Sequence, residues 1–113
     1  LIEINISSES TKFCYSVNNE EEISVLLEDI ERMKSLNALE LRGIMIMPPL
    51  TSNAETNRVH FQTARQMQER ISRSLNMPRF DQISMGTSSD FEVAIEEGAT
   101  FVRIGEVILG KRN

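Results

Sequence analysis

The stretch QISMGTSSDFEVAIEEGATFVRIGEVILG, residues 82–110, decides the fold of this chain. Its first residues, QISM, are typical of a short β-strand, and Gly86 follows them as a turn residue. A helical stripe of apolar side chains begins at Phe91, and Gly98 is placed to end that helix. A second strand over 101–104 comes next. The stretch therefore predicts one strand-helix-strand unit.

The same alternation extends backwards to the start of the chain. The helix over 19–36 is the clearest element, because its apolar residues recur on one face and Asn19 and Glu22 have the spacing of a capping box. Ser89 and Glu92 have the same spacing, which predicts that Ser89 caps the helix of the 82–110 stretch. The expected strands are 1–6, 39–47, 82–85 and 101–104, and the expected helices are 19–36, 55–75 and 89–98, with a helical turn at 107–109.

An order of β-α-β-α-β-α-β predicts an α/β fold with parallel strands joined by right-handed crossovers. Such a sheet is either an open layered sheet or part of a (β/α) barrel of the TIM type. A closed barrel of that type needs eight strands and typically about 250 residues. The strands predicted in these 113 residues therefore correspond to about half a barrel.

Composition narrows the class of protein further. With 113 residues, 40% of them hydrophobic and 26% charged, the chain is long enough for one domain over 1–113. A formal net charge of -5 has the wrong sign for a protein that follows a nucleic-acid backbone. The single cysteine, Cys14, excludes an internal disulfide and cannot by itself hold a structural zinc ion.

The N-terminus and the apolar runs bear on where the protein resides. No run approaches the roughly 20 apolar residues of a membrane span, and the N-terminus resembles no secretory leader. We therefore expect a cytoplasmic protein. The first residue is Leu1 rather than Met, and an apolar run follows at once. We interpret this as a chain that begins in the middle of a longer one.

Two predicted strands end on glycine, and the residues there have the chemistry of an anion site. Thr87, Ser88 and Ser89 place hydroxyl and backbone N–H groups at a helix start, where the helix dipole favours an anion. After the other strand, Gly105 allows a close backbone approach to the same ligand, Glu106 offers its backbone N–H, and Arg103 points from the strand end. In (β/α) barrels the loops after the last two strands are the recurrent phosphate site. The alternative is ordinary helix capping, which uses the same residue types.

The motifs themselves point to a family. SMGTSSDF at 84–91, VRIG at 102–105 and LRGIM at 41–45 resemble the pyridoxal-phosphate homeostasis proteins, which are single-domain relatives of the alanine racemase barrel. The segment INISSESTKF at 4–13 is similar to that family's fifth strand and the loop behind it. The resemblance implies that the chain is the C-terminal half, the last four βα units, of a closed barrel.

The family binds pyridoxal 5'-phosphate (PLP), and the resemblance implies roles for individual residues. Ser88 matches the serine that contacts the cofactor phosphate, and Thr87 lies beside it in the turn. Gly105 and Glu106 match a pair whose backbone N–H groups hold the same phosphate, although relatives often have Thr or Ser at the second position. Arg103 matches the arginine that faces the pyridine nitrogen. A positive charge there disfavours protonation of the ring and weakens the cofactor as an electron sink.

The family's Schiff-base lysine has no counterpart in this chain. It lies in the N-terminal half of the family's barrel, whereas this chain has only Lys12, Lys34 and Lys111, none of them in a matching motif. The resemblance therefore implies no covalent cofactor binding by this chain alone. The missing half of the barrel would supply the lysine.

The sequence thus predicts a PLP-binding cofactor carrier without established catalytic activity, not an enzyme. An alternative is a fragment of a racemase-like or decarboxylase-like PLP enzyme, but Tyr15, the only tyrosine, lies in no matching motif. A third hypothesis is a half-barrel that binds only phosphate or a protein partner. Open sheet edges and an uncovered inner face also predict association, either with the missing half of the barrel or with a second copy of the chain.

Other candidate side chains have plain structural interpretations. His60, the single histidine, is expected on a helix surface, and Cys14 is expected to be an ordinary small residue. The arginines of the second helix are expected to form a solvated face; they are Arg58, Arg65, Arg70 and Arg73.

Overall fold

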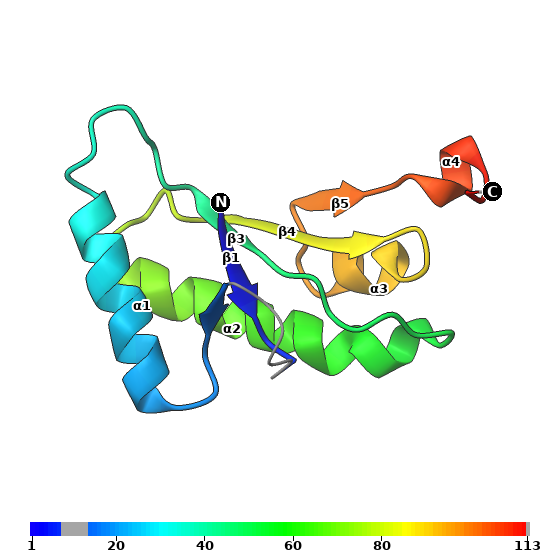
Figure 1. Ribbon diagram of the computed structural model, residues 1–113, viewed down its shortest axis with the longest axis horizontal. Helices are drawn as coiled ribbons and strands as arrows, with labels where there is room; N and C mark the ends of the chain where they lie inside the picture. The colour runs from blue at the N-terminus through cyan, green and yellow to red at the C-terminus, as the bar shows by residue number, and fades with distance from the viewer. Residues whose placement is uncertain (8–13, 113) are drawn as a thin grey trace.

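The computed structural model describes residues 1–7 and 14–112, and its elements alternate along the chain (Figure 1). The strands are β1 (Ile2–Asn5), β2 (Tyr15–Ser16), β3 (Gly43–Met45), β4 (Gln82–Thr87) and β5 (Phe101–Arg103). The helices are α1 (Glu20–Met33), the short 3-10 helix η1 (Ala54–Asn57), α2 (Arg58–Ser74), α3 (Phe91–Glu96) and α4 (Glu106–Leu109). Within this part of the chain, no helix is long and apolar enough to cross a membrane. Of the family-like segment 4–13, residues Glu9, Lys12 and Phe13 lie outside the described residues.

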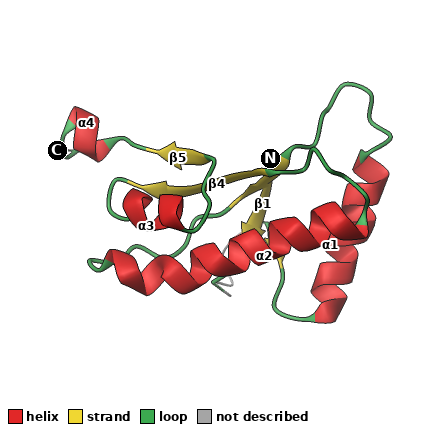
Figure 2. Ribbon diagram, turned by 180° about the vertical axis from the view of Figure 1, so that it is seen from behind, coloured by secondary structure: helices red, strands yellow, loops and turns green. Residues whose placement is uncertain are grey.

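The strands form one sheet in the order β2-β1-β3-β4-β5, and all the pairings are parallel. The predicted α/β class with parallel strands is therefore confirmed. The two-residue strand β2 was not predicted, because two residues carry no periodic pattern. Figures 1 and 2 show α1, α2 and α3 on one side of the sheet, and α4 beyond the end of β5.

Alternate side chains of the strands face the helices and form the core. On β4, Ile83 and Met85 are buried in this core, whereas Ser84 between them points to the other side, where it lines a surface hollow. Full burial of one such large apolar side chain stabilises the fold by roughly 1.5–3 kcal/mol. The largest fully buried side chains are Phe61, Phe80, Ile4, Leu26, Ile30, Ile44, Ile46, Ile71 and Met85.

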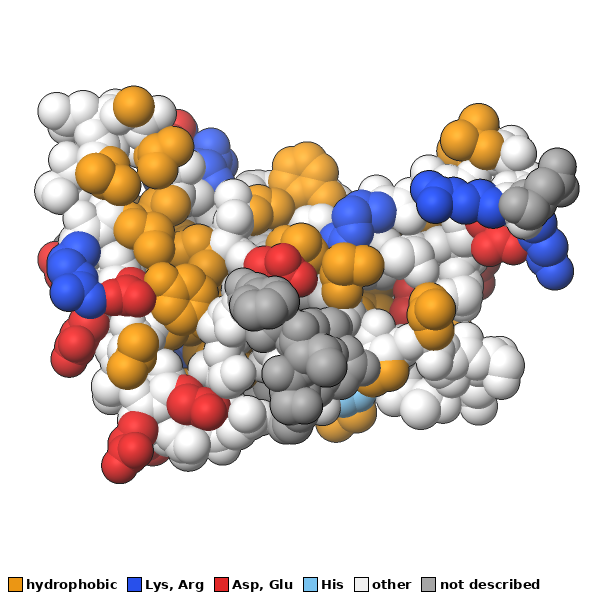
Figure 3. All heavy atoms as spheres, viewed as in Figure 1, with side chains coloured by type: hydrophobic (Ala, Val, Ile, Leu, Met, Phe, Trp, Pro, Cys, Tyr) orange, Lys and Arg blue, Asp and Glu red, His pale blue; other side chains and the backbone are white. Residues whose placement is uncertain are grey.

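The opposite face of the sheet is open among the described residues. Leu1 is 52% exposed and Phe101 is 53% exposed, although both belong to the sheet or adjoin it. Figure 3 shows hydrophobic side chains at the surface along the middle of the molecule. In a closed barrel, the side chains on this face of the strands would fill the interior. The one-sided sheet therefore agrees with the expectation of about half a barrel.

Helix α1 begins where the sequence predicts. The Asn19 Oδ1 accepts a hydrogen bond from the Glu22 N–H at 2.9 Å. The Glu22 carboxylate accepts one from the Asn18 N–H at 2.7 Å, so the reciprocal bond closes one residue earlier than in the predicted capping box. The predicted N-terminus of α1 is thus confirmed, although Asn18 rather than Asn19 donates the reciprocal bond to Glu22.

The predicted cap of α3 is wrong. Asp90 rather than Ser89 is the N-cap residue, and its side chain makes no bond to the first turn of α3. The Asp90 carboxylate instead accepts a hydrogen bond from the Thr87 N–H at 2.8 Å. The predicted stop at Gly98 is confirmed, since this residue follows α3 with a φ of 102° that favours glycine.

The arginines of α2 do not all form a solvated face. Arg58 pairs with Glu55, Glu96 and Glu97 at 2.7, 2.6 and 2.8 Å, and so ties the start of α2 to the end of α3. Hydrogen bonds from Arg58 lower the pKa of Glu97 and the pKa of Glu55. The prediction failed for Arg58 because helix periodicity does not show which other helix lies beside α2.

Two glycines let neighbouring segments approach closely. A Cβ atom at Gly43 would lie 1.8 Å from the carbonyl oxygen of Gln82, so the pairing of β3 with β4 needs glycine there. Gly86 has a φ of 95°, and a Cβ atom at this position would lie 2.6 Å from the Cβ of Ala94. Gly86 therefore makes the sharp turn that the sequence predicts and lets α3 pack against the end of β4.

Candidate functional site

The candidate site lies where β3, β4 and β5 end. The C-terminal ends of parallel strands share one edge of a sheet, so the loops that follow them meet there. This edge holds all the predicted site residues, namely Thr87, Ser88, Arg103, Gly105 and Glu106. The predicted grouping of the two glycine-containing strand ends is therefore present in the structure.

Ser88 joins the loop after β4 to the loop after β5. Its Oγ accepts hydrogen bonds from the backbone N–H of Gly105 at 3.3 Å and of Val107 at 3.1 Å. The family resemblance implies that the N–H groups of Gly105 and Glu106 hold a phosphate, and the structure shows the Gly105 N–H bonded to Ser88 together with that of Val107. The Glu106 side chain is exposed. Two backbone donors thus converge on one oxygen atom, a geometry that also suits an oxygen of an anion.

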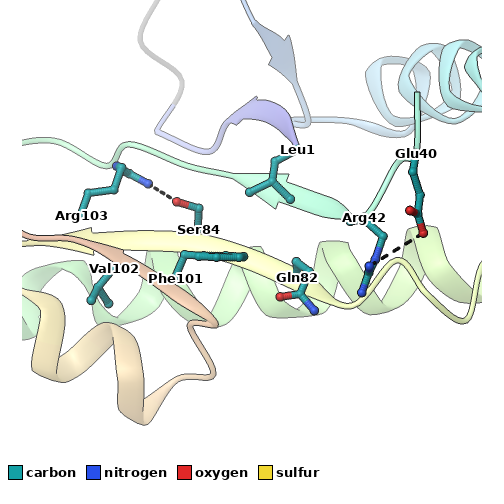
Figure 4. A pocket seen from close by; sticks show the side chains of 8 residues that line it. All are labelled: Leu1, Glu40, Arg42, Gln82, Ser84, Phe101, Val102 and Arg103. Carbon is teal, nitrogen blue, oxygen red and sulfur yellow. Dashed lines mark hydrogen bonds and ion pairs between the residues drawn. The ribbon is translucent and has the colours of Figure 1, made fainter. Parts of the chain in front are cut away.

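Arg103 on β5 is oriented by the two neighbouring strands. Its Nη1 donates to Ser84 Oγ at 2.7 Å, and its Nη2 donates to the carbonyl oxygen of Ile46 at 2.9 Å. Figure 4 shows the Arg103 and Ser84 side chains pointing toward each other. No carboxylate of residues 1–7 and 14–112 forms an ion pair with Arg103. Neutral oxygens therefore hold the guanidinium in place without neutralising its charge.

Thr87 is bonded within its own turn. Its N–H donates to Asp90 Oδ1 at 2.8 Å, and its hydroxyl lies 3.4 Å from both Asp90 Oδ1 and Ser89 Oγ. The Thr87 N–H is therefore already used inside the protein, which removes it from the set of donors expected at the helix start. Asp90 accepts a further bond from Asn57 Nδ2 at 2.9 Å.

A cavity of about 410 Å³ opens beside these groups, within the usual size range of small-molecule sites. Its lining combines the loop after β3 with the ends of β4 and β5: Met47, Pro48, Pro49, Leu50, Gly86, Thr87, Asp90 and Arg103. A hollow of about 670 Å³ on the open face of the sheet also includes Arg103 (Figure 4). Arg103 therefore stands between the cavity at the sheet edge and the open face.

The two lysines among the described residues, Lys34 and Lys111, lie at different places relative to the C-terminal ends of the strands. Lys34 donates to the carbonyl oxygen of Leu75 at 3.0 Å, at the C-terminal ends of α1 and α2 and hence at the opposite edge of the sheet. Lys111 is exposed and lines a hollow of about 640 Å³ together with Gly105. Lys12 lies outside the described residues, so only its sequence context is known.

Tyr15 and His60, the remaining candidates for acid-base chemistry, lie on elements other than β4 and β5. Tyr15 is on β2, and β2 and β5 are the two edge strands of the sheet. Burial and a hydrogen bond to Asp29, with its Oδ2 at 2.8 Å, raise the pKa of Tyr15. His60 lies on α2 and is half-buried. In the described part of the chain, no three His, Cys, Asp or Glu side chains are grouped as metal ligands.

Sequence analysis missed Ser84, Asn57 and Asp90. Strand periodicity could have placed Ser84 on the open face, because it alternates with the buried Ile83 and Met85. Asn57 and Asp90 meet although they are 33 positions apart in the chain. No local pattern predicts such a pair, because it depends on how α2 packs beside α3.

Comparison with curated proteins finds relatives over the whole chain. The chain is 38% identical over 112 residues to a pyridoxal phosphate homeostasis protein of Aquifex aeolicus, which covers 99% of this chain. It is 37% identical to the protein of that name from Vibrio alginolyticus and 34% identical to that from Escherichia coli, each over 100% of this chain. Its curated relatives are pyridoxal phosphate homeostasis proteins. The resemblance in the sequence motifs is thereby confirmed.

The pyridoxal phosphate homeostasis proteins are longer than this chain. The chain spans about half the length of the curated relatives it matches, 46% of the Aquifex aeolicus protein and 45% of the Escherichia coli protein. No family model matches the chain.

Comparison with solved structures agrees on the fold. PipY of Synechococcus elongatus, solved without PLP, has a TM-score of 0.80 and 25% identity over 96% of this chain and 48% of the PipY chain. PipY with PLP bound has a TM-score of 0.73, at 24% identity over 96% of this chain and 49% of its own. The predicted α/β fold, about half of a TIM-barrel-like architecture, is confirmed.

Proposed function

We propose that this chain binds PLP non-covalently and supplies the phosphate and pyridine-nitrogen contacts of a cofactor homeostasis protein. The observation that carries the proposal is the position of Ser88 Oγ between the N–H groups of Gly105 and Val107. Two further findings support it. Relatives named for PLP homeostasis match the whole chain, and one PipY structure of similar fold is described with PLP bound.

The phosphate would bind at the loops after β4 and β5. The Ser88 hydroxyl accepts from two N–H groups of the segment after β5 and still has its own hydrogen to donate to a phosphate oxygen. The family resemblance implies the N–H groups of Gly105 and Glu106 as backbone donors, so a phosphate oxygen would replace Ser88 Oγ as the acceptor of the Gly105 N–H. Thr87 would contribute a hydroxyl at the cavity. Hydrogen bonds to a charged phosphate are stronger than those between neutral groups. The Glu106 carboxylate works against binding, because its charge has the same sign as the phosphate.

The pyridine nitrogen would face Arg103. The guanidinium is held by Ser84 and by the Ile46 carbonyl oxygen, and no described carboxylate pairs with it. A fixed positive charge beside the ring nitrogen disfavours a second positive charge on it. When bound, PLP supplies an electrophilic aldehyde whose electron-withdrawing power depends on that protonation. Arg103 therefore favours carrying the cofactor over catalysing a reaction with it.

We also propose that chain 1–113 is one half of a barrel and that the other half covers its open face. Leu1 and Phe101 are half-exposed on that face, and β2 and β5 each have one unpaired edge among the described residues. Further parallel strands added at these edges would close the barrel. The relatives are about twice as long as this chain, so the occupant to which we commit is their remaining half. That half would also supply the Schiff-base lysine.

The binding proposal is tested by calorimetric titration of the chain with PLP, with pyridoxal and with inorganic phosphate. We expect tighter binding of PLP than of pyridoxal, and a loss of PLP affinity of about tenfold for Ser88→Ala and for Arg103→Ala. Ser88→Ala should leave pyridoxal affinity unchanged, whereas Arg103→Ala should weaken it. Ser89→Ala is the matched control, because Ser89 is an exposed hydroxyl of the same turn. Equal affinity for PLP and pyridoxal in the native chain would contradict the phosphate assignment.

The partner proposal is tested with the part of the Aquifex aeolicus relative that this chain does not match. We expect the two polypeptides to form a one-to-one complex by light scattering and the complex to bind PLP more tightly than the chain alone. After borohydride reduction, the intact mass should show a pyridoxyl adduct on the added half. Three outcomes would contradict the proposal: a stable monomer that does not bind the added half, a homodimer of the chain, or an adduct on the chain itself.

A further inference from the structure

Two polar side chains near the site lie where helices begin and bond to neither helix. Asn57 is the last residue of η1 and leads directly into α2, Asp90 precedes α3, and neither side chain bonds to the first turn of the helix that follows it. An Asp at the N-cap position ordinarily accepts a hydrogen bond from that turn and so stabilises the helix. Here the two side chains bond to each other, with Asn57 Nδ2 donating to Asp90 Oδ2 at 2.9 Å.

The Asn57–Asp90 pair connects the loops that surround the candidate site. Asn57 Nδ2 also donates to the carbonyl oxygen of Pro49, in the loop after β3, at 3.1 Å. Asp90 Oδ1 accepts from the Thr87 N–H, at the end of β4, at 2.8 Å. Asn57 is 2% exposed and Asp90 is 6% exposed. A buried carboxylate is stable only when hydrogen bonds replace its water, so the bonds of this pair depend on one another.

Asp90, one member of the pair, closes the turn that contains Ser88. The Thr87 N–H bond to the Asp90 carboxylate and the Asp90 N–H bond to the Thr87 carbonyl oxygen, at 3.1 Å, close the turn from both sides. Ser88 is inside that turn, and its Oγ reaches the N–H groups of Gly105 and Val107. If the carboxylate moved, the turn would lose the side-chain bond that holds it in this conformation.

We propose that Asn57 and Asp90 are positioning residues that hold Ser88 in place to contact the phosphate of PLP. They act through the turn at 87–90, and the Pro49 bond holds the facing wall of the cavity in the same network. The phosphate part of this inference rests on the proposed function. The placement of Ser88 by the pair does not, and a measurement without ligand tests it separately.

The main test is Asn57→Leu, which keeps the size of the side chain and removes both donated hydrogen bonds. We expect PLP affinity to fall by about tenfold while pyridoxal affinity stays within about twofold, because only the phosphate contact depends on Ser88. A merely structural role would weaken both ligands equally. An unchanged preference for PLP over pyridoxal would overturn the proposal.

Gln68→Leu is the matched control. Gln68 is a carboxamide on α2, the helix that follows Asn57, and it donates to a backbone carbonyl oxygen, that of Phe80, at 2.6 Å, away from the candidate site. We expect this variant to lower the thermal midpoint without changing the preference for PLP over pyridoxal. A change in that preference would show that general loosening of α2 accounts for the effect, and would overturn the proposal.

A double variant keeps the proposal testable if Asn57→Leu does not fold. Asn57→Asp combined with Asp90→Asn reverses the direction of the bond between positions 57 and 90, and it leaves an acceptor for the Thr87 N–H. It removes the bond to Pro49 and places a carboxylate oxygen beside that carbonyl oxygen. The single change Asp90→Asn, by contrast, leaves one side-chain oxygen at position 90, which cannot accept from the Thr87 N–H and from Asn57 Nδ2 as the two carboxylate oxygens do. We expect the double variant to recover most of the PLP preference that this single change loses. No recovery would overturn the proposal.

Amide hydrogen exchange without ligand separates this inference from the proposed function. We expect Asn57→Leu to reduce protection of the Thr87 and Val107 N–H groups by about tenfold or more, while core amides such as that of Ile83 stay protected. If the native chain shows no preference for PLP and these amides still lose protection, the pair positions Ser88 and the proposed function is wrong. If protection at Val107 is unchanged, the positioning inference is wrong whatever the chain binds.

Discussion

The two faces of the sheet differ although the same strands build both. On the covered face, Ile83 and Met85 are buried against the helices and have one structural task. On the open face, Ser84 bonds to Arg103 and Phe101 is half-exposed. Packing within the chain therefore dictates the residue types of the covered face, whereas the open face is free to carry polar side chains such as Ser84 and Arg103.

The largest expected difference in stability is between alanine variants of two phenylalanines, Phe61 on the covered side and Phe101 on the open face. Phe61 is fully buried beneath the covered face, so Phe61→Ala should lower the free energy of unfolding by about 3–5 kcal/mol. Phe101→Ala removes an equally large side chain from the open face and should change that free energy by less than about 1 kcal/mol. Urea denaturation of the two variants measures both effects.

The same two variants should differ in the opposite direction when association with the complementary half is measured. Phe101→Ala should weaken the proposed complex with the complementary half in a light-scattering titration, because in that complex the side chain would fill the barrel interior. A loss of stability in Phe101→Ala comparable with that of Phe61→Ala would mean that the open face is already packed within this chain.

An acid-sensitive contribution to stability belongs to the helical layer. Arg58 lowers the pKa of Glu97 below its usual value of 4.5 chiefly through a hydrogen bond, so the ion pair stabilises the fold above that value. This stability is lost as pH falls through the lowered pKa of the folded state. We expect Arg58→Gln to be less stable than the native chain near about pH 7 and closer to it near about pH 3.

Urea midpoints measured across this pH range provide the check. Arg70→Gln is the control, because Arg70 also pairs with a carboxylate, Glu20, but that carboxylate is far more exposed. We expect Arg70→Gln to change the pH dependence less than Arg58→Gln does, since exposed pairs contribute little. An equal change in both variants would contradict a special role for the junction of α2 with α3.

The smallest expected effect concerns the loop that follows the open-face residue Arg103. Glu106→Thr removes an exposed carboxylate next to the proposed phosphate position and adds a hydroxyl that can donate a hydrogen bond. We expect PLP affinity to rise by about two- to fivefold and pyridoxal affinity to stay unchanged, as for other exposed charges. Calorimetric titration with both ligands decides this, and equal changes for the two would place the effect away from the phosphate.

Local patterns were sufficient to predict much of the fold. The cap at Asn19 and the turn at Gly86 lie where the sequence places them. Their success has a common reason, since helix periodicity, capping and glycine turns depend on residues only a few positions apart. The strand β2 was missed for the same reason, because its two residues are recognised only by their pairing with β1.

The errors near the site all concern contacts between distant segments. Ser89 was predicted to cap α3, but Asp90 is the N-cap residue and its carboxylate bonds to Thr87 and to Asn57 instead. The ion pairs of Arg58 with Glu96 and Glu97 were missed for the same reason. In each case the residue types were predicted correctly, and the bonding partner depends on packing between segments.

Sequence patterns alone predicted the alternation of β1, β3, β4 and β5 with α1, α2 and α3, the residues at the C-terminal ends of β4 and β5, and the family that those motifs resemble. These properties follow from periodicity and turn chemistry, which act over short distances along the chain. Only the tertiary structure decided that Ser84 and Ile46 orient Arg103 and that Asn57 and Asp90 meet beside the turn of Ser88. Those contacts join distant positions, and their geometry depends on how the helices pack on one face of the sheet.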